Sequence, residues 1–149
     1  MASVQTVFGV EGGRGLRISY TCTEAVVGGQ VVEARTTGNT PELVGVAAAG
    51  SLVVVGVALD DVPAAAGYIG QLKVGDGHEL SVVRMAVVEV TFAAAATHRQ
   101  KLATAANGQV TPVTVATQDP RTIVGEAFSS LDRTSSAIAA GARGLAYIY

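Results

Sequence analysis

The sequence predicts a mainly β protein, a small antiparallel β-barrel or β-sandwich with at most one or two short helices. Two observations lead to this prediction. Runs of strand length that are Val-rich or alternate between apolar and polar residues recur along the chain. Turn-forming residues, including most of the 18 glycines, separate these runs. Many short strands at regular spacing, with little helix, are typical of barrels and sandwiches.

Strands are predicted at residues 16–22, 30–34, 52–59, 68–74, 80–92, 110–117 and 145–149. The pair Asn107-Gly108 lies between residues 101–106 and the strand that begins at Val110. Because Asn-Gly readily adopts positive φ, a tight hairpin is predicted at this point.

The best helix candidate spans residues 129–140, and Gly141 would end it. One face of this helix would carry Leu131, Ser135, Ile138 and Ala139. A single short turn is expected at residues 93–96.

A Val-Gly-x-Ala motif occurs at residues 44–47, 55–58 and 124–127, and each copy is followed downstream by Ala-Ala-Gly. We interpret the motif as the end of a strand, where glycine permits a bulge or a close backbone approach. The later Ala-Ala-Gly then opens the next strand. Because the spacing varies, the copies indicate one supersecondary unit reused within a domain. Coincidental turns in an Ala/Gly/Val-rich chain are the alternative.

The 149 residues suit one domain. We expect a flexible N-terminal arm at residues 1–15 and a single β-rich domain at residues 16–149. The arm carries the apolar residues Val4, Val7, Phe8 and Val10. It lacks the charged and continuous apolar regions of a signal peptide, so the protein is expected to stay in the cell that makes it or to leave within a larger particle.

Charge and hydropathy bear on the partners. A net charge of -2 without a basic stripe offers no surface that follows a phosphate backbone, so nucleic acid is not expected. Charged residues make up only 15% of the chain and apolar residues 49%, which favours association with copies of itself or with another protein. The apolar segment 43–59 is shorter than the roughly 20 residues of a membrane span and is interpreted as consecutive buried strands.

Strong catalytic signatures are absent, since the sequence contains no GxSxG, HExxH, P-loop or CxxC motif. Cys22, the single cysteine, is expected to be a buried apolar thiol. Asp76, His78 and Glu79 cluster three potential metal ligands, but neighbours on an extended chain point to opposite faces, and the flanking glycines favour a solvated turn. We therefore expect no enzymatic activity, no metal and no cofactor.

Three passages together resemble a known family. They are VGGQVVE at 27–33 leading to VGVA at 44–47, ATAANGQVTPV at 103–113, and DPRTIVGEA at 119–127 ending in IAAGARG at 138–144. They are similar to the small capsid decoration proteins of tailed bacteriophages, particularly those of actinobacterial phages, and the resemblance covers residues 26–149. It implies a non-enzymatic β-rich module that binds the outside of the expanded head, usually as a homotrimer, and stabilises contacts between major capsid protein subunits.

On this resemblance, the protein is expected on the outer surface of the capsid in the virion, after synthesis in the bacterial host cytoplasm. The arm is then a hypothesised capsid contact that becomes ordered by pairing with a sheet edge of the coat. Its contact residues would be Val4, Val7, Phe8 and Val10.

Two alternatives remain open. The first is a head fibre or host-surface-binding appendage, whose exposed contacts would be the basic segment HRQK at residues 98–101 together with Tyr147 and Tyr149. The second is a small metal-binding or enzymatic domain built on Asp76, His78 and Glu79.

Overall fold

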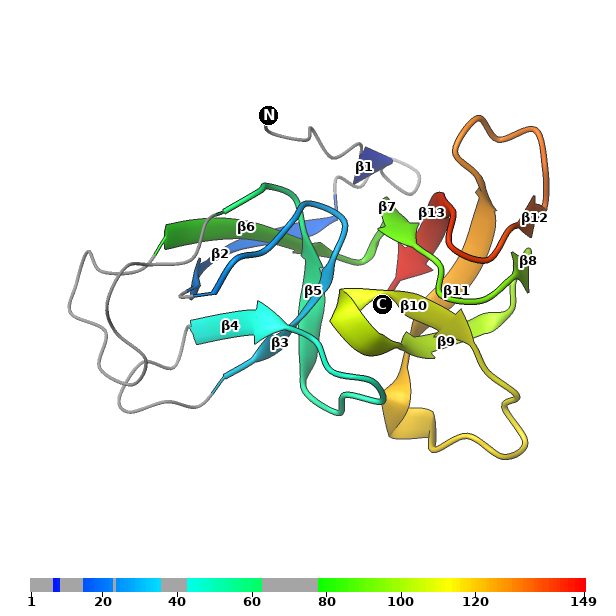
Figure 1. The fold of residues 1–149 in the computed structure, drawn as a ribbon, viewed down its shortest axis with the longest axis horizontal. Helices are drawn as coiled ribbons and strands as arrows, with labels where there is room; N and C mark the ends of the chain where they lie inside the picture. The colour runs from blue at the N-terminus through cyan, green and yellow to red at the C-terminus, as the bar shows by residue number, and fades with distance from the viewer. Residues whose placement is uncertain (1–6, 9–14, 23, 36–42, 63–77) are drawn as a thin grey trace.

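The chain folds into a mainly β protein, as predicted (Figure 1). The computed structural model describes residues 7–8, 15–22, 24–35, 43–62 and 78–149. Five strands close into a barrel, and six others form a second sheet beside it. Within the described ranges, no helix is long and apolar enough to cross a membrane.

The barrel is built from the first part of the chain, in the strand order β2-β4-β3-β5-β6. Antiparallel pairing joins its strands, except that β2 runs parallel to β4. Its strands are β2 (Leu16–Cys22), β3 (Val31–Ala34), β4 (Leu43–Val46), β5 (Val54–Ala58) and β6 (His78–Arg84).

The second sheet is antiparallel, in the order β1-β7-β13-β11-β9-β10. Its strands are β1 (Val7–Phe8), β7 (Ala86–Thr91), β9 (Lys101–Thr104), β10 (Val110–Pro112), β11 (Ile123–Ser130) and β13 (Arg143–Ile148). Phe92, just beyond β7, forms an isolated β-bridge with Val110 of β10, the last strand in the order of the sheet. This pairing brings two distant strands together, so the sheet curls toward closure. A small pair completes the fold, β8 (Ala96–Thr97) with β12 (Ala137–Ile138).

One continuous run of sequence, residues 80–92, contributes strands to both the barrel and the second sheet. The predicted strand at 80–92 is two strands, β6 in the barrel and β7 in the second sheet. Between them Met85 adopts a φ of 57°, which turns the chain out of the barrel. Alternation alone does not reveal this break, because Val-rich sequence continues on both sides of it.

Three barrel strands, β3, β5 and β6, are buried on both faces. Their successive residues point to opposite sides and enter two different hydrophobic clusters, Val31 and Val32 being one such pair. The barrel core lies inside the barrel and consists of Cys22, Val26, Val32, Val44, Ala58, Leu80 and Val82. The joint core connects the barrel to the second sheet. It comprises Val31, Ala47, Val57, Leu59, Val83, Ala86, Val88, Val90, Phe92, Ala96, Leu102, Val110, Val124, Ala127, Ile138, Ala146 and Ile148.

The predicted hairpin at Asn107-Gly108 is confirmed. β9 and β10 are antiparallel neighbours, and the short 3-10 turn η1 (Ala106–Gly108) connects them. Asn107 and Gly108 have φ values of 59° and 66°, the positive values for which these two residue types are suited. A second 3-10 turn, η2 (Pro120–Thr122), leads into β11.

The helix predicted at residues 129–140 is wrong. β11 continues to Ser130, and an exposed loop leads from it to β12. Asp132 organises this loop, because its Oδ1 accepts hydrogen bonds from Ser130 Oγ at 2.6 Å and from Thr134 Oγ1 at 2.7 Å. Short polar side chains that bond locally in this way compete with helical hydrogen bonding. The turn expected at residues 93–96 is also not helical, and β8 begins at Ala96.

The Val-Gly-x-Ala motifs have a common physical basis. In all three, a Cβ on the glycine would collide with a neighbour: side chains of Glu24 and Arg35 at Gly45, the Val83 carbonyl at Gly56, and the Tyr147 carbonyl at Gly125. Pairing is irregular beside the second and third copies. The predicted close approach is therefore confirmed. The prediction that each motif ends a strand is wrong for the third copy, which lies inside β11.

Substitution of Gly56 by alanine should lower the free energy of unfolding by about 2–3 kcal/mol. The new Cβ would lie 2.5 Å from the Val83 carbonyl oxygen, and the φ of 152° disfavours a side chain. Urea denaturation followed by circular dichroism measures the change. Gly50→Asn is the control, because nothing lies within 4 Å of a Cβ at Gly50 and asparagine tolerates its φ of 66°. Equal stabilities of the two variants would contradict the close approach.

Candidate functional site

The residues of the metal-binding alternative are only partly described. His78 is the first residue of β6, Glu79 follows it with an exposed side chain, and Asp76 lies outside the described residues. In the part of the chain that the structure describes, no group of three or more His, Cys, Asp or Glu side chains is placed to hold a metal ion. Support for the metal-binding alternative therefore comes from the sequence alone.

Cys22 is a buried thiol, as predicted. Its side chain belongs to the barrel core, and Sγ donates to the Glu24 carbonyl oxygen at 3.0 Å. Burial raises the pKa of the Cys22 thiol above its ordinary value, which keeps the sulfur in its poorly nucleophilic protonated form.

Two of the four arm residues lie in the described part of the chain. Val7 and Phe8 form β1, which pairs with Val88 and Val87 at the edge of β7. Val4 and Val10 lie outside the described residues. Within one chain, β1 therefore adds a strand to its own second sheet; the hypothesised pairing with a coat protein stays a prediction.

A polar and aromatic cluster, here called the sheet-face cluster, consists of Lys101, Glu126, Tyr147 and Tyr149. The ladder places Lys101 opposite Glu126, and Glu126 opposite Tyr147, across β9, β11 and β13. Lys101 Nζ lies 2.9 Å from Glu126 Oε2, donates to the Tyr149 hydroxyl and lies 5.1 Å from the centre of the Tyr149 ring. The rings of Tyr147 and Tyr149 meet edge to face, with centres 5.7 Å apart.

These contacts fix the charges of the cluster. Hydrogen bonds to Tyr149 and Glu126 raise the pKa of Lys101, and the hydrogen bond from Lys101 lowers the pKa of Glu126. Both side chains are partly exposed, so their mutual attraction is weakened by solvent and contributes at most about 1 kcal/mol to stability.

The basic segment 98–101 runs directly into this cluster. His98 and Arg99 donate main-chain hydrogen bonds to the carbonyl oxygens of Ser136 and Ala127, at 2.8 and 2.7 Å. The His98 ring meets the Phe128 ring edge to face, with centres 5.7 Å apart. The structure thus brings together, through Lys101, the residues that the appendage alternative selected at two distant places in the sequence.

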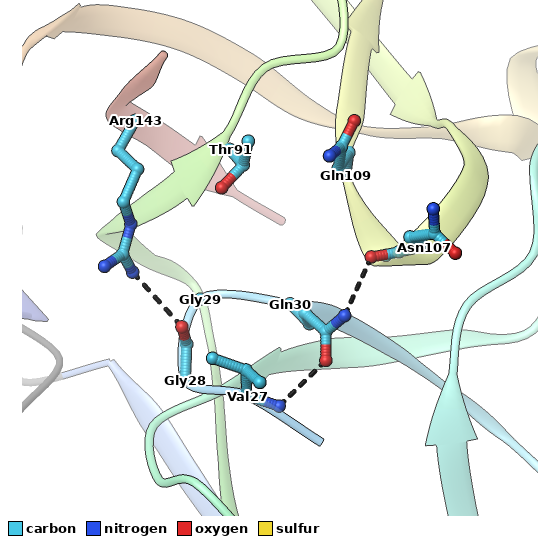
Figure 2. Close-up of a pocket in the computed structure, with 9 residues that line it drawn as sticks. Val27, Gly28, Gly29, Gln30, Thr91, Asn107, Gln109 and Arg143 are labelled. Carbon is cyan, nitrogen blue, oxygen red and sulfur yellow. Dashed lines mark hydrogen bonds between the residues drawn. The ribbon is translucent and has the colours of Figure 1, made fainter. Parts of the chain in front are cut away.

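A cavity, here called the junction cup, lies where the barrel meets the second sheet (Figure 2). It has a volume of 320 Å³, within the range of small-molecule sites. Its lining residues are Val27, Gly28, Gly29, Gln30, Thr91, Asn107, Gly108, Gln109 and Arg143. The barrel supplies residues 27–30, and the second sheet and its turns supply the others.

Two hydrogen-bonded bridges hold the two sides of the cup together (Figure 2). In one, Arg143 donates to the Gly28 carbonyl oxygen at 3.1 Å, while its Nε lies 3.2 Å from Glu89 Oε1. In the other, Gln30 Nε2 donates to the Asn107 carbonyl oxygen at 3.0 Å, while Gln30 Oε1 accepts from the Val27 amide at 2.8 Å. The bridges fix the width of the cup.

The polar side chains that remain in the cup are neutral. Thr91, Asn107 and Gln109 supply one hydroxyl and two carboxamides, and none of these side chains bonds to another described residue. The nine lining residues include no carboxylate, histidine or cysteine. These groups are suited to hydrogen bonding with a bound molecule rather than to proton transfer or metal binding.

Sequence reasoning did not select the cup as a site. The signal was nonetheless present, because Val27 to Gln30, Asn107 to Gln109 and Arg143 belong to the three passages that carry the family resemblance. Close packing explains the glycine at position 108, where a Cβ would lie 2.8 Å from the Val31 carbonyl oxygen. The passages are distant in sequence, and only the fold shows that they meet.

Comparison with known proteins gives one informative result. No family model matches the chain, and no curated protein matches it significantly. Among solved structures, the chain is similar to the base of the N-terminal part of the head fibre protein gp8.5 of bacteriophage phi29, with a TM-score of 0.62 and 17% sequence identity. The match covers 90% of this chain and 93% of that one. At this identity, the likeness shows a shared fold.

Replacement of Lys101 by methionine should raise the pKa of Glu126 toward its ordinary value of 4.5, because the hydrogen bond from Lys101 is the main cause of its lowering. A lowered carboxyl pKa stabilises the fold above the unfolded value, and that contribution is lost as the pH falls through the folded value. A carbon-13 NMR titration of the Glu126 carboxyl measures the shift. Arg84→Met, at an exposed position on β6, is the control. The same Glu126 pKa in both variants would contradict the assignment.

Proposed function

We propose that this chain is a structural protein of a tailed-phage virion, bound to the outside of the head. The observation that supports it most is the fold shared with the phi29 head fibre base, which extends over nearly the whole of both chains. The resemblance of the three glycine-containing passages to capsid decoration proteins supports the same class from the sequence.

The described surface suits repeated protein contacts. Large apolar side chains are exposed at Leu16, Ile18, Val27, Leu52, Val53, Met85, Val115, Leu131 and Tyr149. Together with the small share of charged residues, they favour association with other proteins. The proposed partners are the major capsid protein and further copies of this chain, as a homotrimer. The proposed role is non-enzymatic and needs no cofactor.

Two finer roles follow. In the first, the protein stabilises contacts between major capsid protein subunits, because a protein that binds only the assembled shell lowers the free energy of that shell. In the second, it is the base of a head fibre or of a host-surface-binding appendage. The fibre base named in the solved structure favours the second role, and the sheet-face cluster provides exposed aromatic and charged contacts for it.

The copy number of this chain per major capsid protein, measured by quantitative mass spectrometry of purified virions, separates these roles. Near-equal copies are expected of a protein that stabilises the whole lattice, and sparse copies of a fibre base. Absence of the chain from the virion would contradict the proposal.

Virions made with a chain lacking residues 1–15 test the arm. The number of copies of the shortened chain per virion should be at least ~10-fold lower than that of the full chain, which corresponds to a loss of about 1.4 kcal/mol or more of binding free energy. An unchanged copy number would contradict the arm contact.

A further inference from the structure

The junction cup has the composition of a ligand site that the proposed structural role does not use. We propose that it binds a compact, uncharged, hydroxyl-rich molecule, namely a single sugar unit of a larger glycan. The inference rests on the geometry of the cup and goes beyond the proposed function.

The charge of the cup selects against ions. Arg143 is the only charged residue among the described residues of the lining, and its Nε lies 3.2 Å from the Glu89 carboxylate. The guanidinium charge is thereby balanced where it enters the cup. Among the described lining residues, a phosphate or a free carboxylate would meet no net positive charge, and a cation would meet no carboxylate.

The remaining polar groups match hydroxyls. The Thr91 hydroxyl and the Asn107 and Gln109 carboxamides can each donate and accept hydrogen bonds. Thr91 and Gln109 lie between the two bridges in the view of Figure 2, whereas the Asn107 carboxamide points away from the cup. A ligand whose groups also both donate and accept satisfies Thr91 and Gln109, and sugar hydroxyls do so in closely spaced sets.

The shape of the cup favours a compact ligand over an extended chain. The Arg143–Gly28 bridge lies on one side and the Gln30–Asn107 bridge on the other, so the two bridges limit the width of a half-open cup. The glycines at positions 28, 29 and 108 line it with bare backbone, which lets a ring with several substituents approach closely.

The site should be weak for a single sugar. The nine described lining residues include no aromatic ring on which a sugar could stack, so affinity depends on hydrogen bonds that each contribute only about 1 kcal/mol net. If the proposed function holds, several copies on one particle would compensate, because linked weak sites gain avidity without new contacts. A glycan on a cell surface is therefore a suitable ligand, and a free monosaccharide is its simplest probe.

The experiment is a two-dimensional amide NMR titration of the purified full chain with D-glucose, D-galactose, L-rhamnose and N-acetyl-D-glucosamine, each in the millimolar range. At least one sugar should shift the main-chain amides at positions 28, 29 and 108 and the side-chain amide of Gln109. The double variant Thr91→Val/Gln109→Leu should weaken that binding at least ~10-fold, since it removes two hydrogen-bonding groups.

Thr111→Val is the matched control, since Thr111 lies in β10 and outside the lining; it should bind as the unaltered chain does. D-glucuronate tests the charge argument and should bind no tighter than D-glucose. Absence of these shifts with all four neutral sugars, unchanged binding by the double variant, or tighter binding of D-glucuronate would each overturn the inference. Because the assay uses the isolated chain, its result is independent of whether the protein is found in the virion.

Discussion

The burial of one wall of the barrel on both faces is the constraint on which the rest of the structure depends. In β3, β5 and β6, neighbouring residues such as Val57 and Ala58 enter different cores, one inside the barrel and one shared with the second sheet. Full burial of a valine contributes about 1.5–3 kcal/mol, so each strand of this wall stabilises two units at once. The junction cup lies where the barrel and the second sheet are connected by the two hydrogen-bonded bridges instead of by apolar packing.

Close packing around this wall explains the glycines at positions 56 and 108. Gly56 lies against β6, and Gly108 lies against β3, at positions where a Cβ would enter the neighbouring backbone. The same proximity brings residues 27–30 and 107–109 to either side of the cup. A requirement of the fold therefore also shapes the candidate site, and the fold shared with a phage head fibre base extends over 90% of the chain.

The strand content and the hairpin at Asn107-Gly108 could be predicted, because alternation and turn chemistry are local properties. The division of residues 80–92 at Met85 could not, since Val-rich sequence continues across it and only tertiary packing favours the bend. The helix prediction at 129–140 gave too little weight to local bonding by Ser130, Asp132 and Thr134. The cup could not be predicted from the sequence, because its lining joins four segments that are distant in the sequence.

The central claim is that the shared wall makes the barrel and the second sheet one cooperative unit. Tyr20 reports on the barrel and Tyr147 on the second sheet, so urea unfolding of fluorotyrosine-labelled protein, followed by fluorine NMR, observes both at once. We predict that the folded signals of the two residues disappear with the same midpoint and the same slope, as two-state unfolding requires. Separate midpoints, with one unit folded while the other is unfolded, would contradict the account.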